Sequence, residues 1–209
     1  MINVDLEPDP DCRSCVIFCE TKCRNCENDR ERIDIFSPFC EIGAPFMTIR
    51  KITEYPEKVL AEIGKPVTEF DDELAALCAD MFETMYDAEG VGLAAPQIGL
   101  NLRVFVMDCD GIKLVAANPE IVHTEGEQSG QEGCLSVGKV PAVLSRPLKA
   151  RLKAQNEKGE WFERDAEGYA ARAFLHETDH CDGTLFIDHL PKMRRAMVLR
   201  RFNKDKRFS

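Results

Sequence analysis

Two histidines four residues apart constrain the fold of this chain more than any other feature of its sequence. His176 and His180 stand in the stretch HETDH, and residues at this spacing share one face of an α-helix. Both imidazoles can therefore converge on one ion, with Glu177 where the His-Glu-x-x-His motif places a general base. The apolar residues Ala173 and Phe174 just before favour a helix in the core over a solvated helix that carries the five letters by chance. The sequence thus predicts a buried helix with a catalytic metal site.

A catalytic site of this kind needs a third protein ligand, and the sequence offers few candidates. In one metalloprotease pattern a third histidine stands three residues after a glycine such as Gly183, but position 186 is phenylalanine. His189 lies beyond the strand-like stretch TLFID and is expected at the surface. The other candidate is Cys134, because the glycine before it and the apolar residues after it suit an extended segment that presents a thiolate. The residues alone make Cys134 a candidate without deciding the ligand set.

Charge and hydropathy exclude several classes of protein. The net charge of −10 gives no reason to expect binding to DNA or to an anionic membrane. No stretch approaches the roughly 18 apolar residues of a membrane span, and the acidic start MINVDLEPDPDC lacks the apolar core of a secretory signal. We therefore expect a cytoplasmic protein whose ten cysteines stay reduced and serve metal binding or burial.

Hydrophobic periodicity predicts a few separated helices among several strands. Such a pattern is typical of an α+β fold with antiparallel strands rather than of alternating α/β units. A turn at 156–159 joins the last two strands in a hairpin. The predicted helices cover residues 70–90, 167–180 and 191–206, and the predicted strands cover 102–108, 113–122, 148–156 and 160–164.

Three motifs together resemble those of a known enzyme family. GVGLAAPQIG at 90–99, EGCLS at 132–136 and HETDH at 176–180 occur in this order and at these separations in peptide deformylases, which remove the N-formyl group from nascent chains. The resemblance covers about residues 47–191, and the three motifs together are specific where each alone would be weak. It implies metal-dependent hydrolysis of the formyl group from the N-terminal formylmethionine of newly synthesised polypeptides, with release of formate.

The resemblance implies a metal site and a fold around it. The ligands would be Cys134, His176 and His180, with a water in the open fourth place. The usual ion of the family is Fe(II), which zinc, nickel or cobalt can replace. Glu177 would act first as general base and then as general acid. The implied fold is α+β, with antiparallel sheets around a central helix that bears the two histidines, and a C-terminal helix.

The resemblance also implies how the substrate is held. The Gln97 carboxamide and the Leu135 backbone N–H would form the oxyanion hole, where losing one donor typically costs about 10²–10³ in rate. The segment beside the substrate backbone would be Val91, Gly92 and Leu93, in which glycine allows a close approach. A phosphate-binding loop is disfavoured here because the stretch lacks the final Lys-Ser/Thr and follows a helix. Tyr169, Arg172 and Ala173 are expected to border the pocket for the methionine side chain.

The chain departs from the family pattern at positions that are neither ligands nor the general base, and two other functions stand beside the one that the resemblance implies. Leu175 stands where glutamine is common and Cys181 where leucine is common, and we expect Cys181 to fill the core rather than to bind metal. One alternative is a related hydrolase that acts on another small N-acyl amine. Another is a metal- or redox-sensing module built on the N-terminal cysteines. Intact Glu177 and Gln97 argue against the second alternative, because a pure metal binder needs neither.

The two ends of the chain differ from its middle. Residues 192–209 carry eight cations against one acid, which is either a solvated helix face or, as in some bacterial deformylases, a contact with the ribosome. Residues 1–46 hold six of the ten cysteines, five of them as C-x2-C-x3-C-x3-C-x2-C. Zinc sites usually separate such pairs by about 12–20 residues, whereas seven lie between them here. We therefore expect a Cys-rich extension over 1–46 that is poorly ordered or not in the mature protein, with a metal site as the alternative, and a catalytic domain over 47–209.

Overall fold

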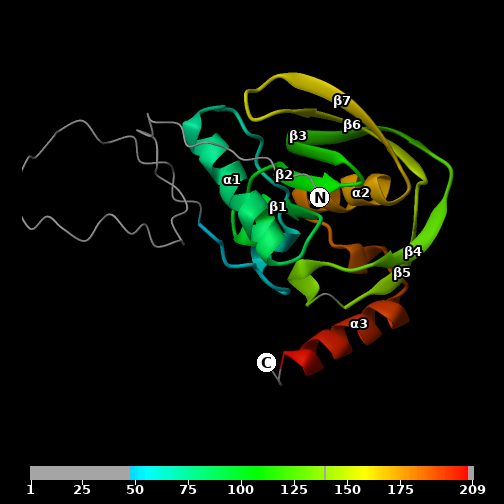
Figure 1. Ribbon diagram of the computed structural model, residues 1–209. Helices are drawn as coiled ribbons and strands as arrows, with labels where there is room; N and C mark the ends of the chain where they lie inside the picture. The colour runs from blue at the N-terminus through cyan, green and yellow to red at the C-terminus, as the bar shows by residue number, and fades with distance from the viewer. Residues whose placement is uncertain (1–47, 139, 207–209) are drawn as a thin grey trace, which may run out of the picture. The chain divides into compact units, whose positions relative to one another are not determined.

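A computed structural model describes residues 48–138 and 140–206 of the chain, and its fold is α+β, as expected (Figure 1). Five antiparallel strands form the larger sheet in the order β1-β2-β3-β6-β7, and β4 and β5 form a second, two-stranded sheet. The strands are β1 (Gly92–Ala94), β2 (Val104–Cys109), β3 (Ile112–Glu125), β4 (Gln128–Glu132), β5 (Ala142–Arg146), β6 (Lys149–Gln155) and β7 (Trp161–Glu167). The helices are α1 (Asp72–Asp87), α2 (Gly168–Cys181) and α3 (Lys192–Asp205), with 3-10 turns at η1 (Lys58–Ala61), η2 (Ala95–Ile98), η3 (Leu135–Val137) and η4 (Phe186–His189).

Helix α2 crosses the larger sheet and contacts all five of its strands. Strand β2 lies under it and is buried on both faces, because successive side chains point to opposite sides of a sheet. Phe105 and Met107 pack toward α2, whereas Val104 and Val106 pack toward α1. Burial on both faces explains why this strand reads as a continuous apolar run rather than an alternating one.

Helix α1 begins where the sequence predicts and ends earlier. The Asp71 side chain caps it by accepting a hydrogen bond of 3.0 Å from the backbone N–H of Leu74. The sequence favours Gly90 as the end of the helix, but the helix stops at Asp87, and the left-handed residue that follows is Glu89, with φ 55°. Gly90 instead closes the turn by donating its N–H to the Met85 carbonyl at 2.8 Å.

The second, smaller core joins the C-terminal helix to the two-stranded sheet. Val198 and Phe202 of α3 pack in one cluster with Leu144 of β5 and with buried residues around η4. The strand-like reading of TLFID is wrong, because Phe186 and Ile187 are buried in a 3-10 turn that Asp188 caps. The predicted basic helix from about 191 is confirmed. Among the described residues, the helices are all too short or too polar to cross a membrane.

The sequence analysis missed two strands, and one of its predictions cannot be compared with the structure. Strand β4 was not predicted because QSGQE is polar throughout and gives no strand pattern. Strand β5 was not predicted because it is a stretch of five residues between Pro141 and Pro147. The Cys-rich extension over residues 1–46 lies outside the described residues.

Gly183 follows α2 at a position that no other residue fits, and we expect Gly183→Ala to destabilise the fold strongly. Its φ is +71°, and a Cβ here would lie 2.8 Å from the backbone carbonyl carbon of Glu62. Gly111 is the matched control, since its φ is +75° and a Cβ there would meet nothing within 4 Å. Denaturant unfolding should show a loss of about 1–2 kcal/mol for Gly111→Ala and about 3 kcal/mol or more for Gly183→Ala. Equal losses would contradict the role given to the backbone contact.

Candidate metal centre

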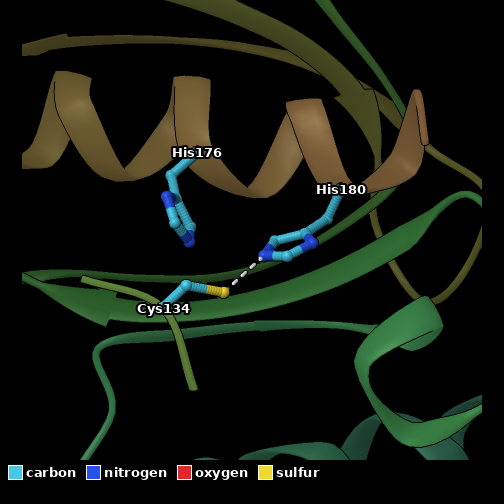
Figure 2. Close-up of side chains that lie close together, drawn as sticks. All are labelled: Cys134, His176 and His180. Atoms are coloured by element: carbon cyan, nitrogen blue, oxygen red, sulfur yellow. Dashed lines mark hydrogen bonds between the residues drawn. The ribbon is translucent and has the colours of Figure 1, made fainter. Parts of the chain in front are cut away.

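Three buried side chains meet between α2 and the segment that follows β4. Figure 2 shows His176 and His180 projecting from one face of α2 toward Cys134. The Cys134 Sγ lies 3.2 Å from the His180 Nε2, and the three potential ligand atoms all lie within 4.8 Å of one another. The three residues are 3%, 9% and 1% exposed in chain order. Within the described part of the chain, no other group of His, Cys, Asp or Glu side chains converges in this way.

The chemistry of these donors fits a divalent transition metal. Glu132 Oε1 lies 2.7 Å from the His176 Nδ1, so the Nε2 of that ring is left to face the cluster. Burial lowers the pKa of His180 and keeps its imidazole neutral, which is the form that binds metals. The pKa of His176 is instead raised although burial opposes it, because Cys134 and Glu132 both bond to the ring. One thiol and two imidazoles are typical ligands of zinc, iron, nickel and cobalt.

Glu132 belongs to a buried charge network that the sequence analysis missed. Burial alone would raise the pKa of its carboxyl, but hydrogen bonds from His176 and Arg146 hold that pKa well below its usual range. Its oxygens lie 2.7 Å from Arg146 Nη2 and 2.8 Å from Arg172 Nη1. His189 is not part of the metal cluster; it is half-exposed and lies 2.8 Å from Asp179. The one sequence signal for the network was the place of Glu132 two residues before Cys134 in EGCLS.

Gln97 is buried in η2 with its amide nitrogen aimed at the cluster. Its Oε1 accepts a hydrogen bond of 2.9 Å from the Ala94 backbone N–H. The Nε2 therefore faces the other way, 3.6 Å from Cys134 Sγ and 3.4 Å from Ser136 Oγ. This orientation presents N–H donors, not an acceptor, to the space beside the cluster.

Glu177 is 4% exposed and lies directly beneath strand β1. A Cβ added to Gly92 would stand 2.3 Å from the Glu177 Oε1, so the strand can pass over this carboxyl only with a glycine there. The other oxygen, Oε2, is buried and has no hydrogen-bond partner among the residues that the structure describes. Burial raises the pKa of Glu177 to about 7, in the range that suits a group that takes up and returns a proton near neutral pH.

Most of the residues that the sequence analysis predicted to form the site line one open cavity of about 210 Å³. Two of them do not line it. Leu93 packs toward α1 in the core behind β1, and His180 lies deeper in the metal cluster. The lining includes Val91, Gly92, Gln97, Cys134, Leu135, His176 and Glu177, and also Tyr169, Arg172 and Ala173.

The contact between Gly92 and Glu177 gives a prediction that separates chemistry from metal binding. Gly92→Ala should lower kcat by about 10²-fold or more, since a displacement of about 1 Å at a reacting group can have this effect. Metal content should stay near that of the wild type, because the three atoms nearest to an added Cβ all belong to Glu177 and not to a candidate ligand. Gly130→Ala in β4 is the control, since a Cβ there would lie at an ordinary 3.4 Å from its nearest atom. Full activity of Gly92→Ala in the formate-releasing reaction that the family resemblance implies would contradict the placement of Glu177.

The sequence and the fold both match known proteins. The sequence model of the family described as Polypeptide deformylase matches residues 49–196. A peptide deformylase from Acidobacterium capsulatum is 49% identical over 166 residues, which cover 77% of this chain and 98% of that relative. One from Clostridium botulinum is 50% identical over 147 residues, which cover 70% of this chain and 99% of the relative.

Solved structures of peptide deformylases also resemble this chain in fold. The crystal structure of a peptide deformylase from Legionella pneumophila superposes with a TM-score of 0.74 at 46% identity, covering 77% of this chain and 97% of the other. A peptide deformylase from Synechococcus elongatus, in complex with actinonin, gives a TM-score of 0.70 at 35% identity, covering 74% and 86%. Because the family model matches most of the chain and close relatives match almost from end to end, this chain belongs to the polypeptide deformylase family.

Proposed function

We propose that the protein hydrolyses the N-formyl group from the N-terminal formylmethionine of newly synthesised polypeptides and releases formate, with one divalent metal ion held by Cys134, His176 and His180. The observation that carries this proposal is the cluster of these three donors beside a cavity that a buried carboxyl, Glu177, and a carboxamide, Gln97, help to line. Membership of the family supports the choice of substrate.

The proposed reaction needs one proton acceptor and one proton donor, and Glu177 serves as both. A divalent ion held by the three ligands would act as a Lewis acid: it would polarise the formyl carbonyl and lower the pKa of the attacking water. The Glu177 carboxylate takes a proton from the attacking water as the bond to the formyl carbon forms. It then gives that proton to the amine nitrogen as the carbon–nitrogen bond breaks and formate leaves. The raised pKa of Glu177 suits transfer in both directions.

Neighbouring groups stabilise the oxyanion and position the peptide. The Gln97 amide nitrogen and the Leu135 backbone N–H donate to the oxygen that gains charge. Strand β1, with Val91 just before it and Gly92 and Leu93 within it, lies beside the substrate backbone. Support comes from the sheet order, in which β1 is an edge strand that pairs with β2 on one side, so an extended peptide can pair along the other.

The depth of the site favours a formyl group over an ordinary peptide bond. The three ligand residues are buried, and the cavity beside them is small. Tyr169, Arg172 and Ala173 border the cavity on the α2 side, where the methionine side chain is placed. A formyl carbon can reach such a recessed centre, whereas an internal peptide bond with chain on both sides cannot.

A formate-release assay tests the proposed function. Anaerobically purified protein should release formate from formyl-Met-Ala-Ser and leave acetyl-Met-Ala-Ser and free N-formylmethionine largely unchanged. Equal or faster turnover of the free formyl amino acid would favour a hydrolase of small N-acyl amines instead. No formate release from either formyl substrate by metal-loaded protein would overturn the proposal.

We propose Fe(II) as the native ion, with zinc, nickel or cobalt able to replace it. The support is the family resemblance together with the mixed thiol and imidazole donors. Air should inactivate the iron form through iron loss and oxidation of Cys134, while the nickel form should survive. The lifetime of each form in air is measured as the loss of its formate-releasing activity. Equal lifetimes of the iron and nickel forms would count against iron as the native ion.

We propose that residues 47–209 form the complete catalytic domain and that residues 1–46 are dispensable for the reaction. The family match begins at residue 49 and supports this boundary. A protein that begins at Met47 should deformylate as fast as the full chain and bind the same single metal ion. A second metal ion bound by the full chain and lost in the shorter protein would show that the N-terminal cysteines form a site.

We also propose that the enzyme works in the cytoplasm, where polypeptides are made, and contacts the ribosome through α3. Deleting this helix would remove Val198 and Phe202 from the smaller core, so charge substitution is the cleaner test. Four cations of α3 point into solvent and can change without loss of packing: Arg194, Arg200, Arg201 and Lys204.

Replacing these four cations by glutamine should weaken ribosome co-sedimentation at low salt. The slope of log affinity against log salt concentration should also become shallower, by up to about one for each residue that contacts a phosphate. Turnover of small formyl peptides should not change. The matched control carries glutamine at four exposed lysines elsewhere, namely Lys51, Lys58, Lys65 and Lys158. Equal co-sedimentation of the two variants would leave α3 as an ordinary solvated helix.

A further inference from the structure

Arg146 on β5 is buried and bonds to two carboxylates on different elements. It is 6% exposed, and its Nη2 and Nε lie 2.7 Å and 3.2 Å from the two oxygens of Glu132 on β4. Its Nη1 lies 2.7 Å from Asp179 Oδ2 on α2. One guanidinium thus links the two-stranded sheet to the helix that crosses the larger sheet.

Each of these carboxylates stands within two residues of a candidate metal ligand in the sequence. Glu132 stands two residues before Cys134 and also lies 2.7 Å from the Nδ1 of His176. Asp179 directly precedes His180 in α2. Through these two contacts Arg146 connects the segments that carry all three ligands, although it touches none of the ligand atoms itself.

We infer that Arg146 is a positioning residue, which holds the Cys134 segment and α2 at the separation that the metal site requires. The inference rests on the proposed metal centre and adds a residue to it that no motif of the sequence singled out. It also explains why an arginine is buried here, since a buried charge is tolerated where it is paired and hydrogen-bonded.

Arginine suits this position because of its shape as well as its charge. The guanidinium is a rigid plane with five N–H donors, so it can bond to both oxygens of one carboxylate and still reach a second carboxylate. A lysine keeps the positive charge but presents it at one point, and it cannot span Glu132 and Asp179 together. Arg146→Lys therefore separates the bridging geometry from the charge balance.

Cobalt(II) is the probe, because its visible absorption reports the ligand geometry independently of activity. Full-length wild type and Arg146→Lys are each loaded with cobalt, and the affinity is measured by competition with a chelator. The variant should bind cobalt about 10–100-fold more weakly, the usual effect of losing a partner of a metal ligand, with shifted absorption bands. Wild-type affinity and an unchanged spectrum in Arg146→Lys would overturn the inference.

Arg50→Lys controls for the loss of an arginine–carboxylate pair away from the site, since the partly exposed Arg50 bonds to Asp80 on α1 with Nε and Nη2 at 2.9 Å and 2.7 Å from one oxygen. This control should bind cobalt like the wild type. A comparable loss in both variants would mean that the effect is general destabilisation, and it too would overturn the inference.

A double-mutant cycle with Asp179→Asn tests the bridge itself, and Asp179→Asn alone serves as the test if Arg146→Lys does not fold. Asp179→Asn removes one end of the bridge and should by itself weaken cobalt binding and shift the spectrum. The losses in the double variant should be smaller than the sum of the single losses, because both changes break the same contact. Additive losses, or no effect of Asp179→Asn, would overturn the bridge. If the wild type binds no cobalt, the proposed metal centre fails instead, so the two failures are distinguishable.

Discussion

Cys134→Ala protein is expected to lose tight metal binding and, with it, formate release. Cys134 provides the one sulfur donor of the cluster, and its removal leaves two imidazoles from a single helix. Two neutral ligands hold a divalent ion far more weakly than three ligands that include a thiolate, so affinity should fall by at least about 10³-fold. Elemental analysis after extensive dialysis should find little metal in the variant and about one ion per wild-type chain.

Cys181→Ala is the matched control for this experiment. Cys181 directly follows His180, yet it is fully buried in the core formed by α2 and the larger sheet. Burial raises the pKa of its thiol well above the usual range, so it is held as a protonated filler rather than a thiolate. This variant should keep its metal and lose only some stability. If both variants retain one ion per chain, Cys134 is not a ligand.

The second large effect is expected at Glu177, which is assigned to proton transfer and not to coordination. Glu177→Gln keeps the shape of the side chain beneath Gly92 but removes the group that accepts and returns the proton. We expect kcat to fall by about 10²–10⁴-fold or more, because one residue serves both steps. Metal content should remain that of the wild type, measured by elemental analysis on the same samples.

Glu177→Ala separates proton transfer from packing. It should lose as much activity as the glutamine variant, although it vacates the space under β1. Turnover close to that of the wild type in either metal-loaded variant would refute the role of Glu177. A loss of metal in both would instead mean that this carboxyl helps to hold the ion.

How much of this site could be predicted depends on how local its signals are. The spacing of His176 and His180 places both on one helical face whatever the rest of the chain does, so the buried helix could be predicted from the sequence. Strand β2 was predictable for a similar reason, because burial on both faces leaves an uninterrupted apolar run. Such patterns need no knowledge of the fold.

The charge network beneath the ligands could not be predicted, because its members come from separate segments. Glu132, Arg146 and Arg172 are residue types that usually lie at the surface, and only their mutual pairing in the folded chain makes burial tolerable. Strands β4 and β5 escaped prediction for a related reason. β4 is polar throughout and β5 is a short stretch between two prolines, so pairing between the two strands, not hydrophobic alternation, defines them.

The three-residue length of β1 bears on how one enzyme can accept many different chains. The substrate pairing proposed along this edge would use only backbone groups, which every polypeptide shares, so it would discriminate little among the sequences that follow the first residue. Selectivity would then be confined to the formyl group and the side chain beside it. The short length of β1 also disfavours edge-to-edge pairing, because three residues offer few backbone hydrogen bonds to a strand from another copy of the protein. A short edge strand is therefore compatible both with the proposed acceptance of many peptide sequences and with little strand exchange at β1.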